Sequence, residues 1–188
     1  MQNSPLDPVT DQISKAIYGG ILDELVKVRD AGLYRAALIL TLSGIDSMAY
    51  LSMPAQQDEV KRSDFIAWVD KYLGLAGGAG ISGEEIYGFR CGMVHTYTAN
   101  SKLHREGKVR MIVPMRGKLP KAVNDNIMPG IVGLSIEHFI QNFIDGVNRF
   151  VPDLFQDSTK HAVIENRLNR MMIVEAGITS EELKKWGF

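Results

Sequence analysis

Hydrophobic residues recur along most of this chain at gaps of three and four, the spacing of one helix face. Residues 11–30 carry one apolar stripe, whereas residues 33–52 are apolar almost all round, which is typical of a central helix with neighbours on several sides. The same spacing along the chain predicts six helical regions, at 11–30, 33–52, 63–73, 82–97, 135–150 and roughly 158–175.

Polar and glycine-rich stretches separate these regions. A polar loop comes after residue 52, and the sequence GLAGGAG at 74–80 is typical of a flexible connector. Ser82 and Glu85 have the spacing of a capping box, which marks the start of the helix that runs to about Tyr97. Thr179 and Glu182 repeat this spacing and predict a short terminal turn.

The helical period is lost between residues 105 and 134. Two short apolar segments there, VRMIV at 109–113 and IVGL at 131–134, have the composition of strands. We therefore predict one all-α domain: an up-and-down bundle of five to six helices with an inserted β-hairpin or arm at about 105–134. Residues 1–10 are expected to be loose, and 158–188 to form a C-terminal helical extension.

Composition narrows the class of protein. The 188 residues are 45% hydrophobic and carry a net charge of −1, so no overall positive field for nucleic acid exists. A single cysteine, Cys91, excludes an internal disulfide framework and a cysteine-rich zinc site, and the histidines lack zinc-like spacing. We expect neither a metal nor a cofactor. Without a signal peptide or a membrane-spanning run, we expect a cytoplasmic protein.

Positive charge is nevertheless concentrated between residues 102 and 121. This segment holds one acid, Glu106, and seven bases: Lys102, Arg105, Lys108, Arg110, Arg116, Lys118 and Lys121. Such a local field would attract a phosphate backbone. The alternative is a solvated hairpin whose lysines protect an edge strand from pairing with other chains.

The helix at 82–97 carries an unusual set of residues. On an ideal helical wheel, Gly88, Gly92 and His95 share the face opposite the apolar stripe, and Arg90 lies about 140° from His95. Two glycines inside a helix indicate a steric need for close approach. A purely structural interpretation is also open, in which Arg90 pairs with Asp46 and His95 is a satisfied core histidine.

The segment YGFRCGMVHTYT, with its R-x4-H spacing and the order of helices before it, resembles the HEPN superfamily of helical bundles. Many members of that superfamily are metal-independent RNases. The resemblance covers roughly residues 11–100. It implies a homodimer in which motif helices from two subunits meet at one cleft, with Arg90 and His95 as the catalytic pair. In one departure, Cys91 comes directly after the arginine where many members have a polar residue, often asparagine.

The chemistry of these residue types agrees with the resemblance. RNA is cut without metal when its 2′-OH attacks the adjacent phosphorus, which needs a proton-moving group such as His95 and a fixed cation such as Arg90. Packing along Gly88 and Gly92 would then form the dimer interface. Polarity or charge indicates a further set of residues for substrate binding: Tyr97, Ser101, Lys102, Arg105 and Lys108.

The sequence therefore predicts an RNA-binding HEPN-like protein that acts as a metal-independent endoribonuclease of the toxin or defence type. A protein antitoxin or regulator would be a further partner. The alternative is a non-catalytic HEPN-like interaction module that binds a nucleotide, RNA or a protein partner, and Cys91 favours this alternative. Whether the Gly88 and Gly92 face meets another subunit or the same chain is left open by the sequence.

Overall fold

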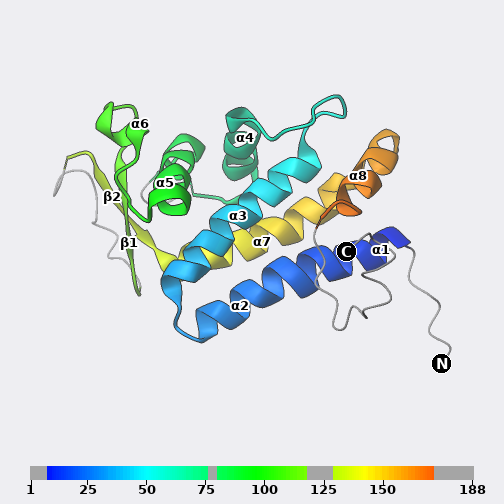
Figure 1. Cartoon of the computed structure of the whole chain (residues 1–188), viewed down its shortest axis with the longest axis horizontal. Helices are drawn as coiled ribbons and strands as arrows, with labels where there is room; N and C mark the ends of the chain where they lie inside the picture. Colours follow the sequence, from blue (N-terminus) through cyan, green and yellow to red (C-terminus); the bar gives the residue numbers. More distant parts are fainter. Residues whose placement is uncertain (1–7, 76–79, 118–128, 172–188) are drawn as a thin grey trace, which may run out of the picture.

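The computed structural model describes residues 8–75, 80–117 and 129–171. Most of them are helical (Figure 1). The helical elements are α1 (Pro8–Ile13), the π-helical η1 (Ser14–Leu22), α2 (Asp23–Asp30), α3 (Tyr34–Ser52), α4 (Arg62–Tyr72), α5 (Gly83–Thr96), α6 (Lys102–Arg105), α7 (Ile136–Leu154), the 3-10 turn η2 (Ser158–Lys160) and α8 (His161–Leu168). The strands are β1 (Met111–Met115) and β2 (Ile131–Ser135).

Each of the six predicted helical regions contains a helix, although residues 172–188, at the end of the last region and of the predicted C-terminal extension, lie outside the described residues. α1, η1 and α2 succeed one another without a break, so the first helical rod begins at Pro8, inside the segment expected to be loose (Figure 1). Proline suits a first helical turn because its missing N–H would be unpaired there anyway. The predicted cap at Thr179 and Glu182 lies outside the described residues.

The helix α3 is the centre of the bundle, as its apolar composition predicts. It contacts α2, α4, α5, α7 and α8. Gly44 lets α7 come close, because a β-carbon added at Gly44 would lie 2.5 Å from the ring of Phe143. The rings of Phe143 and Phe150 each lie 5.9 Å from the ring of Trp68 in α4, which completes the aromatic part of the core.

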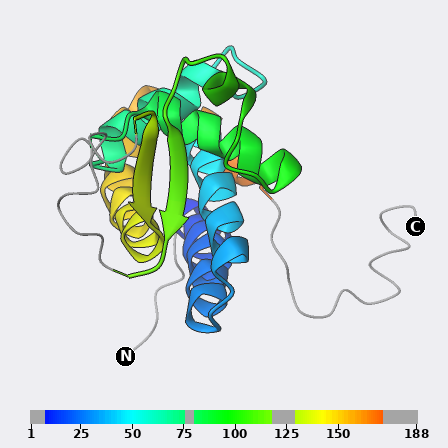
Figure 2. The same ribbon diagram turned by 90° about the vertical axis from the view of Figure 1, so that its left-hand side faces the viewer.

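The two strands pair in parallel, with Met111 opposite Ile131 and Met115 opposite Ser135 (Figure 2). They therefore do not form the predicted hairpin, in which neighbouring strands run in opposite directions. β2 leads directly into α7, because Ser135 ends the strand and caps this helix by accepting a hydrogen bond from the His138 N–H.

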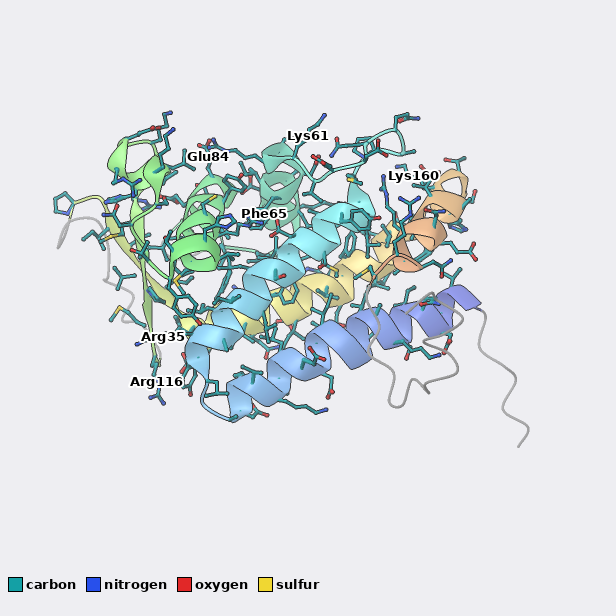
Figure 3. The ribbon with its side chains drawn as sticks, viewed as in Figure 1. Arg35, Lys61, Phe65, Glu84, Arg116 and Lys160 are labelled. Atoms are coloured by element: carbon teal, nitrogen blue, oxygen red, sulfur yellow. The ribbon has the colours of Figure 1, made fainter. Side chains whose placement is uncertain are left out.

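The two strands, which are the described ends of the predicted insertion, pack into the core. Three strand side chains, Ile112, Val132 and Leu134, are at most 3% exposed. At the far end of β1, the Arg116 guanidinium lies 4.4 Å from the centre of the Tyr34 ring, at the end of the molecule where α3 begins (Figure 3). The β-branched composition correctly predicts strands here, but it does not reveal their burial.

One charged contact fastens this strand segment to α5. Arg110 donates from Nε and Nη2 to the two carboxylate oxygens of Glu85, and from Nη2 to the Gly80 carbonyl at 2.9 Å. Glu85 is also the acidic member of the predicted capping box, accepting from the Ser82 N–H at 2.8 Å. Arg110, predicted only as part of a basic patch, is thus held in the structure.

The C-terminal region is anchored by another arginine. Arg167 of α8 is only 5% exposed, and its guanidinium donates to the carbonyls of Met53 and Pro54 at 2.6 and 2.8 Å. These carbonyls lie just beyond the end of α3, where helix backbone acceptors have no partner within the helix. None of the helices in the described ranges is long and apolar enough to cross a membrane.

The Glu85 contact predicts a pH dependence of stability. Burial acts to raise the pKa of Glu85, but the hydrogen bonds and charge of Arg110, with the bonds from Ser82, outweigh it and leave the pKa below its ordinary value of 4.5. A carboxylate with a lowered folded-state pKa stabilises the protein above its unfolded pKa, and that contribution disappears as the pH falls through the folded-state value. Stability should therefore fall as the pH drops below 4.5.

We expect Glu85→Gln to lower the free energy of unfolding at pH 7 by about 1.5–3 kcal/mol and to weaken this loss in acid. Urea unfolding of both proteins between pH 7 and pH 3 measures the effect. Glu106→Gln is the matched control, because Glu106 pairs with Lys108 at the solvent-exposed surface and should matter less. Equal effects of the two substitutions would contradict the role given to Glu85.

Candidate functional site

The helix α5 begins with the predicted capping box and is fixed against α4. Ser82 and Glu85 exchange hydrogen bonds, and the Gly83 N–H donates to the Asp70 carboxylate at 2.7 Å. A β-carbon at Gly83 would lie 2.7 Å from the Ile66 carbonyl oxygen, so the first residue of α5 fits closely against α4. The start of the helix is therefore firmly placed, and this sets the direction in which its later residues point.

Two turns further on, Arg90 reaches across to α3. Its Nε donates to Asp46 Oδ2 at 2.9 Å, and its Nη2 lies 2.8 Å from the same oxygen. The Arg90 and Asp46 side chains are 23% and 28% exposed, so the pair lies at the edge of the bundle, open to solvent on one side. This is the partner that the sequence suggested for the arginine.

Burial and the ion pair compete in setting the pKa of each group, and the pKa of both groups is raised. Burial raises the pKa of the Asp46 carboxyl, and the hydrogen bond and charge of Arg90 offset only part of the rise. For Arg90, burial acts to lower the pKa, but the hydrogen bond and charge of Asp46 raise it above its ordinary value. Because burial of the carboxylate cancels much of the attraction, the pair serves to position the guanidinium more than to stabilise the fold.

The third member of the group is His95, which lies at the surface in the last turn of α5. Its Nε2 is 3.1 Å from Arg90 Nη1. A guanidinium only donates hydrogen bonds, so Nε2 accepts here and the proton of the neutral ring is on Nδ1. Asp46, Arg90 and His95 thus form one connected set, which we call the Asp46–Arg90–His95 group.

The helical wheel is therefore misleading for Arg90 and His95. It describes where the β-carbons leave the helix, and the two positions do diverge around the axis. The long arginine stem carries its charged end well away from that starting point, and Asp46 fixes the end where His95 can meet it. One protomer brings the two groups together, and a second subunit is not needed for their contact.

The Asp46–Arg90–His95 group leaves donors available to a ligand. Arginine has five N–H bonds. Two are used by Asp46 and one by His95, and the other two have no partner among the described residues. The arrangement offers an anion a charged planar donor, and an anion that draws the Arg90 Nη1–H away from His95 would free the imidazole Nε2 to accept a proton.

Gly88 and Gly92 face their own chain. A β-carbon at Gly92 would lie 2.2 Å from the Thr98 carbonyl oxygen, and one at Gly88 would lie 3.1 Å from a methyl group of Val109. Both glycines are buried by this packing. The expectation that they form a dimer interface is corrected: the steric need is real, but the segment after α5 fills the space.

Four of the five predicted substrate-binding residues are exposed, and the fifth, Ser101, is buried. Tyr97 is 58% exposed and comes directly after α5. Lys102 and Lys108 are mostly exposed and both pair with Glu106, while Arg105 donates to the Asn100 carbonyl at 2.8 Å. Ser101 is only 4% exposed, and its hydroxyl caps α6 by accepting from the His104 N–H. Ser101 is therefore a structural residue and not a surface contact; Lys118 and Lys121 lie outside the described residues.

Sequence reasoning did not single out Tyr87, one turn before Arg90. The Arg62 guanidinium lies 5.3 Å from the centre of its ring, and Arg62 also pairs with Glu84 at the surface of α5. Burial and the nearby Cys91 side chain raise the pKa of Tyr87. The sequence signal that could have identified Tyr87 is its spacing of three residues from Arg90, because residues three apart on a helix are neighbours.

In the described part of the chain, no group of three or more His, Cys, Asp or Glu side chains is placed to hold a metal ion. No protein-family model matches the sequence, and no curated protein or solved structure is significantly similar to it.

The packing of the two glycines predicts different responses to the same substitution. Gly92→Ala should lower the free energy of unfolding by about 2–3 kcal/mol, because its methyl group meets a backbone carbonyl that cannot move aside. Gly88→Ala should cost less than about 1 kcal/mol, since a side-chain methyl can adjust and alanine favours the helix. Denaturant unfolding of the two variants, with gel filtration to track their mass, provides the test. Equal stabilities combined with loss of a dimer in both would instead support the interface first predicted.

Proposed function

We propose that this protein is an RNA-binding, HEPN-like endoribonuclease that cleaves without a metal. The observation that carries the proposal is the contact of Arg90 with His95 at the edge of a single bundle, with Asp46 holding the arginine. Attack by a ribose hydroxyl on phosphorus requires at least a group that accepts a proton and a fixed cation next to it. The resemblance of the R-x4-H segment to HEPN motifs supports the same chemistry.

In the proposed reaction, the bound phosphate draws the Nη1–H of Arg90 away from His95, and the freed Nε2 of the neutral ring takes the proton from the 2′-OH. The 2′-oxygen then forms a bond to phosphorus while the bond from phosphorus to the 5′-oxygen breaks. The two remaining donors of Arg90 bind the phosphoryl oxygens as negative charge builds on them. Water at the open site protonates the departing 5′-oxygen, and His95 returns its proton to solvent. The products are a 2′,3′-cyclic phosphate and a 5′-hydroxyl.

The exposed residues that follow α5 in the chain would bind the rest of the RNA. Lys102 and Lys108 have side chains 81% and 60% exposed, and their pairs with Glu106 are of the weak surface kind that a phosphate can replace. Because such contacts release counterions from RNA, affinity should fall steeply with salt. The homodimer, the antitoxin or regulator and the cytoplasmic location remain predictions of the sequence.

A non-catalytic module is the second candidate, and one observation favours it. Asp46 already occupies two N–H groups of Arg90, which reduces what the guanidinium can offer to a phosphate. In that case the same surface would bind RNA without cutting it. Cleavage and binding assays on one set of variants separate the two functions.

We expect the wild-type protein to cut labelled single-stranded RNA in the presence of EDTA, leaving cyclic phosphate ends. Loss of the proton acceptor in His95→Ala should reduce the rate by about 100-fold or more, and loss of the cation in Arg90→Ala by about 100–1000-fold. His138→Ala and Arg35→Ala are matched controls, because both residues are exposed on other helices. Salt-sensitive binding without cutting, retained in all four variants, would support the non-catalytic module.

A mixing experiment tests whether one protomer supplies the whole site. Arg90→Ala and His95→Ala chains are co-expressed, so that any dimer formed can combine the two. Each protomer then lacks one of the two groups, so the mixture should stay inactive. Recovery of activity would mean that the arginine and histidine come from different subunits.

A further inference from the structure

Tyr97 has a backbone conformation that its side chain does not favour. Its φ of 56° and ψ of 30° lie in the left-handed region, and it is the only residue besides glycines with a positive φ in the described ranges. A side chain with a β-carbon is strained there, which is why glycine usually occupies such positions after a helix.

The conformation itself has a structural purpose. It reverses the chain after α5, so that the N–H groups of Tyr97 and Thr98 both donate to the Gly92 carbonyl. Glycine at position 97 would make the same reversal with less strain. The reversal thus explains the backbone of Tyr97 but gives no reason for an aromatic side chain at this position.

Packing does not explain the side chain either. Tyr97 is 58% exposed, the largest exposed fraction among the large hydrophobic residues described. An aromatic residue at a strained position that stays largely in water lowers stability in two ways, through the backbone and through unburied apolar surface. This combination indicates a ligand.

The surroundings indicate which ligand. Tyr97 is two residues from His95, and exposed lysines and Arg105 come within the next turns of chain. Arg105 holds the Asn100 carbonyl, so the loop that carries the tyrosine is tied to the basic α6. Aromatic faces beside positive charge are how proteins bind single-stranded nucleic acid, with a base on the ring and phosphates on the cations.

We propose that the Tyr97 ring stacks on an unpaired nucleobase next to the phosphate bound by Arg90, and that this contact selects single-stranded over double-stranded RNA. In a duplex the bases are stacked on one another and their faces are closed to the ring. The inference rests on the proposed function, because it assumes that the Asp46–Arg90–His95 group binds an RNA phosphate.

Three substitutions separate stacking from backbone strain. Tyr97→Phe keeps the ring and the strain, Tyr97→Leu keeps the strain without a ring, and Tyr97→Gly removes both. We expect affinity for single-stranded RNA to be unchanged in the Phe variant and about 5- to 100-fold weaker in the Leu and Gly variants. The melting temperature should rise by about 2–4 °C in the Gly variant alone.

Affinity is measured with a 2′-O-methyl RNA strand, which cannot be cut, alone and annealed to its complement. A series of strands, each lacking one base, locates the contact. The wild type should prefer the single strand and be sensitive to one missing base, and Tyr97→Gly should lose both properties. RNA binding by the wild type with no such difference in the Gly variant overturns the inference while leaving the proposed function intact. If the wild type neither binds nor cuts RNA, the proposed function fails, and the inference fails with it.

Discussion

The ion pair between Asp46 and Arg90 joins the central helix to the helix that carries the candidate chemistry. Without it, the arginine stem would be free to extend into solvent, since long charged side chains usually keep their ends in water. With it, two nitrogens of the guanidinium are fixed and a third meets His95. Because this ion pair connects α3 to α5, the packing of the two helices also determines where the Arg90 and His95 side chains lie.

The rest of the molecule keeps α5 where the pair can form. The capping box and Asp70 fix the start of the helix, and the contact of Glu85 with Arg110 ties its first turn to β1. At the other end, Gly92 makes room for the chain reversal at Tyr97. Several of these contacts are charged, and the backbone of Tyr97 is strained, although apolar packing would be more stable. This pattern is expected where the placement of functional groups matters more than stability.

The sequence predicted the helices and the capping box, because each depends on local spacing. It offered the pairing of Arg90 with Asp46 within the structural interpretation, because a charge on an apolar helix needs a partner. It did not predict that β1 and β2 run in parallel, since strand direction depends on how the chain returns from one strand to the next. It also indicated the steric need at Gly88 and Gly92 but could not tell which surface meets them. The contact of Arg90 with His95 was missed because a helical wheel contains no side-chain length.

Nuclear magnetic resonance of the His95 ring tests the Asp46–Arg90–His95 group most directly. At a pH where the ring is neutral, nitrogen shifts should place its proton on Nδ1, because Nε2 accepts from Arg90. Arg90→Met should move the proton toward Nε2, and Asp46→Asn should do so in part, by releasing the arginine. A wild-type ring that already carries its proton on Nε2, and that neither substitution changes, would contradict the account.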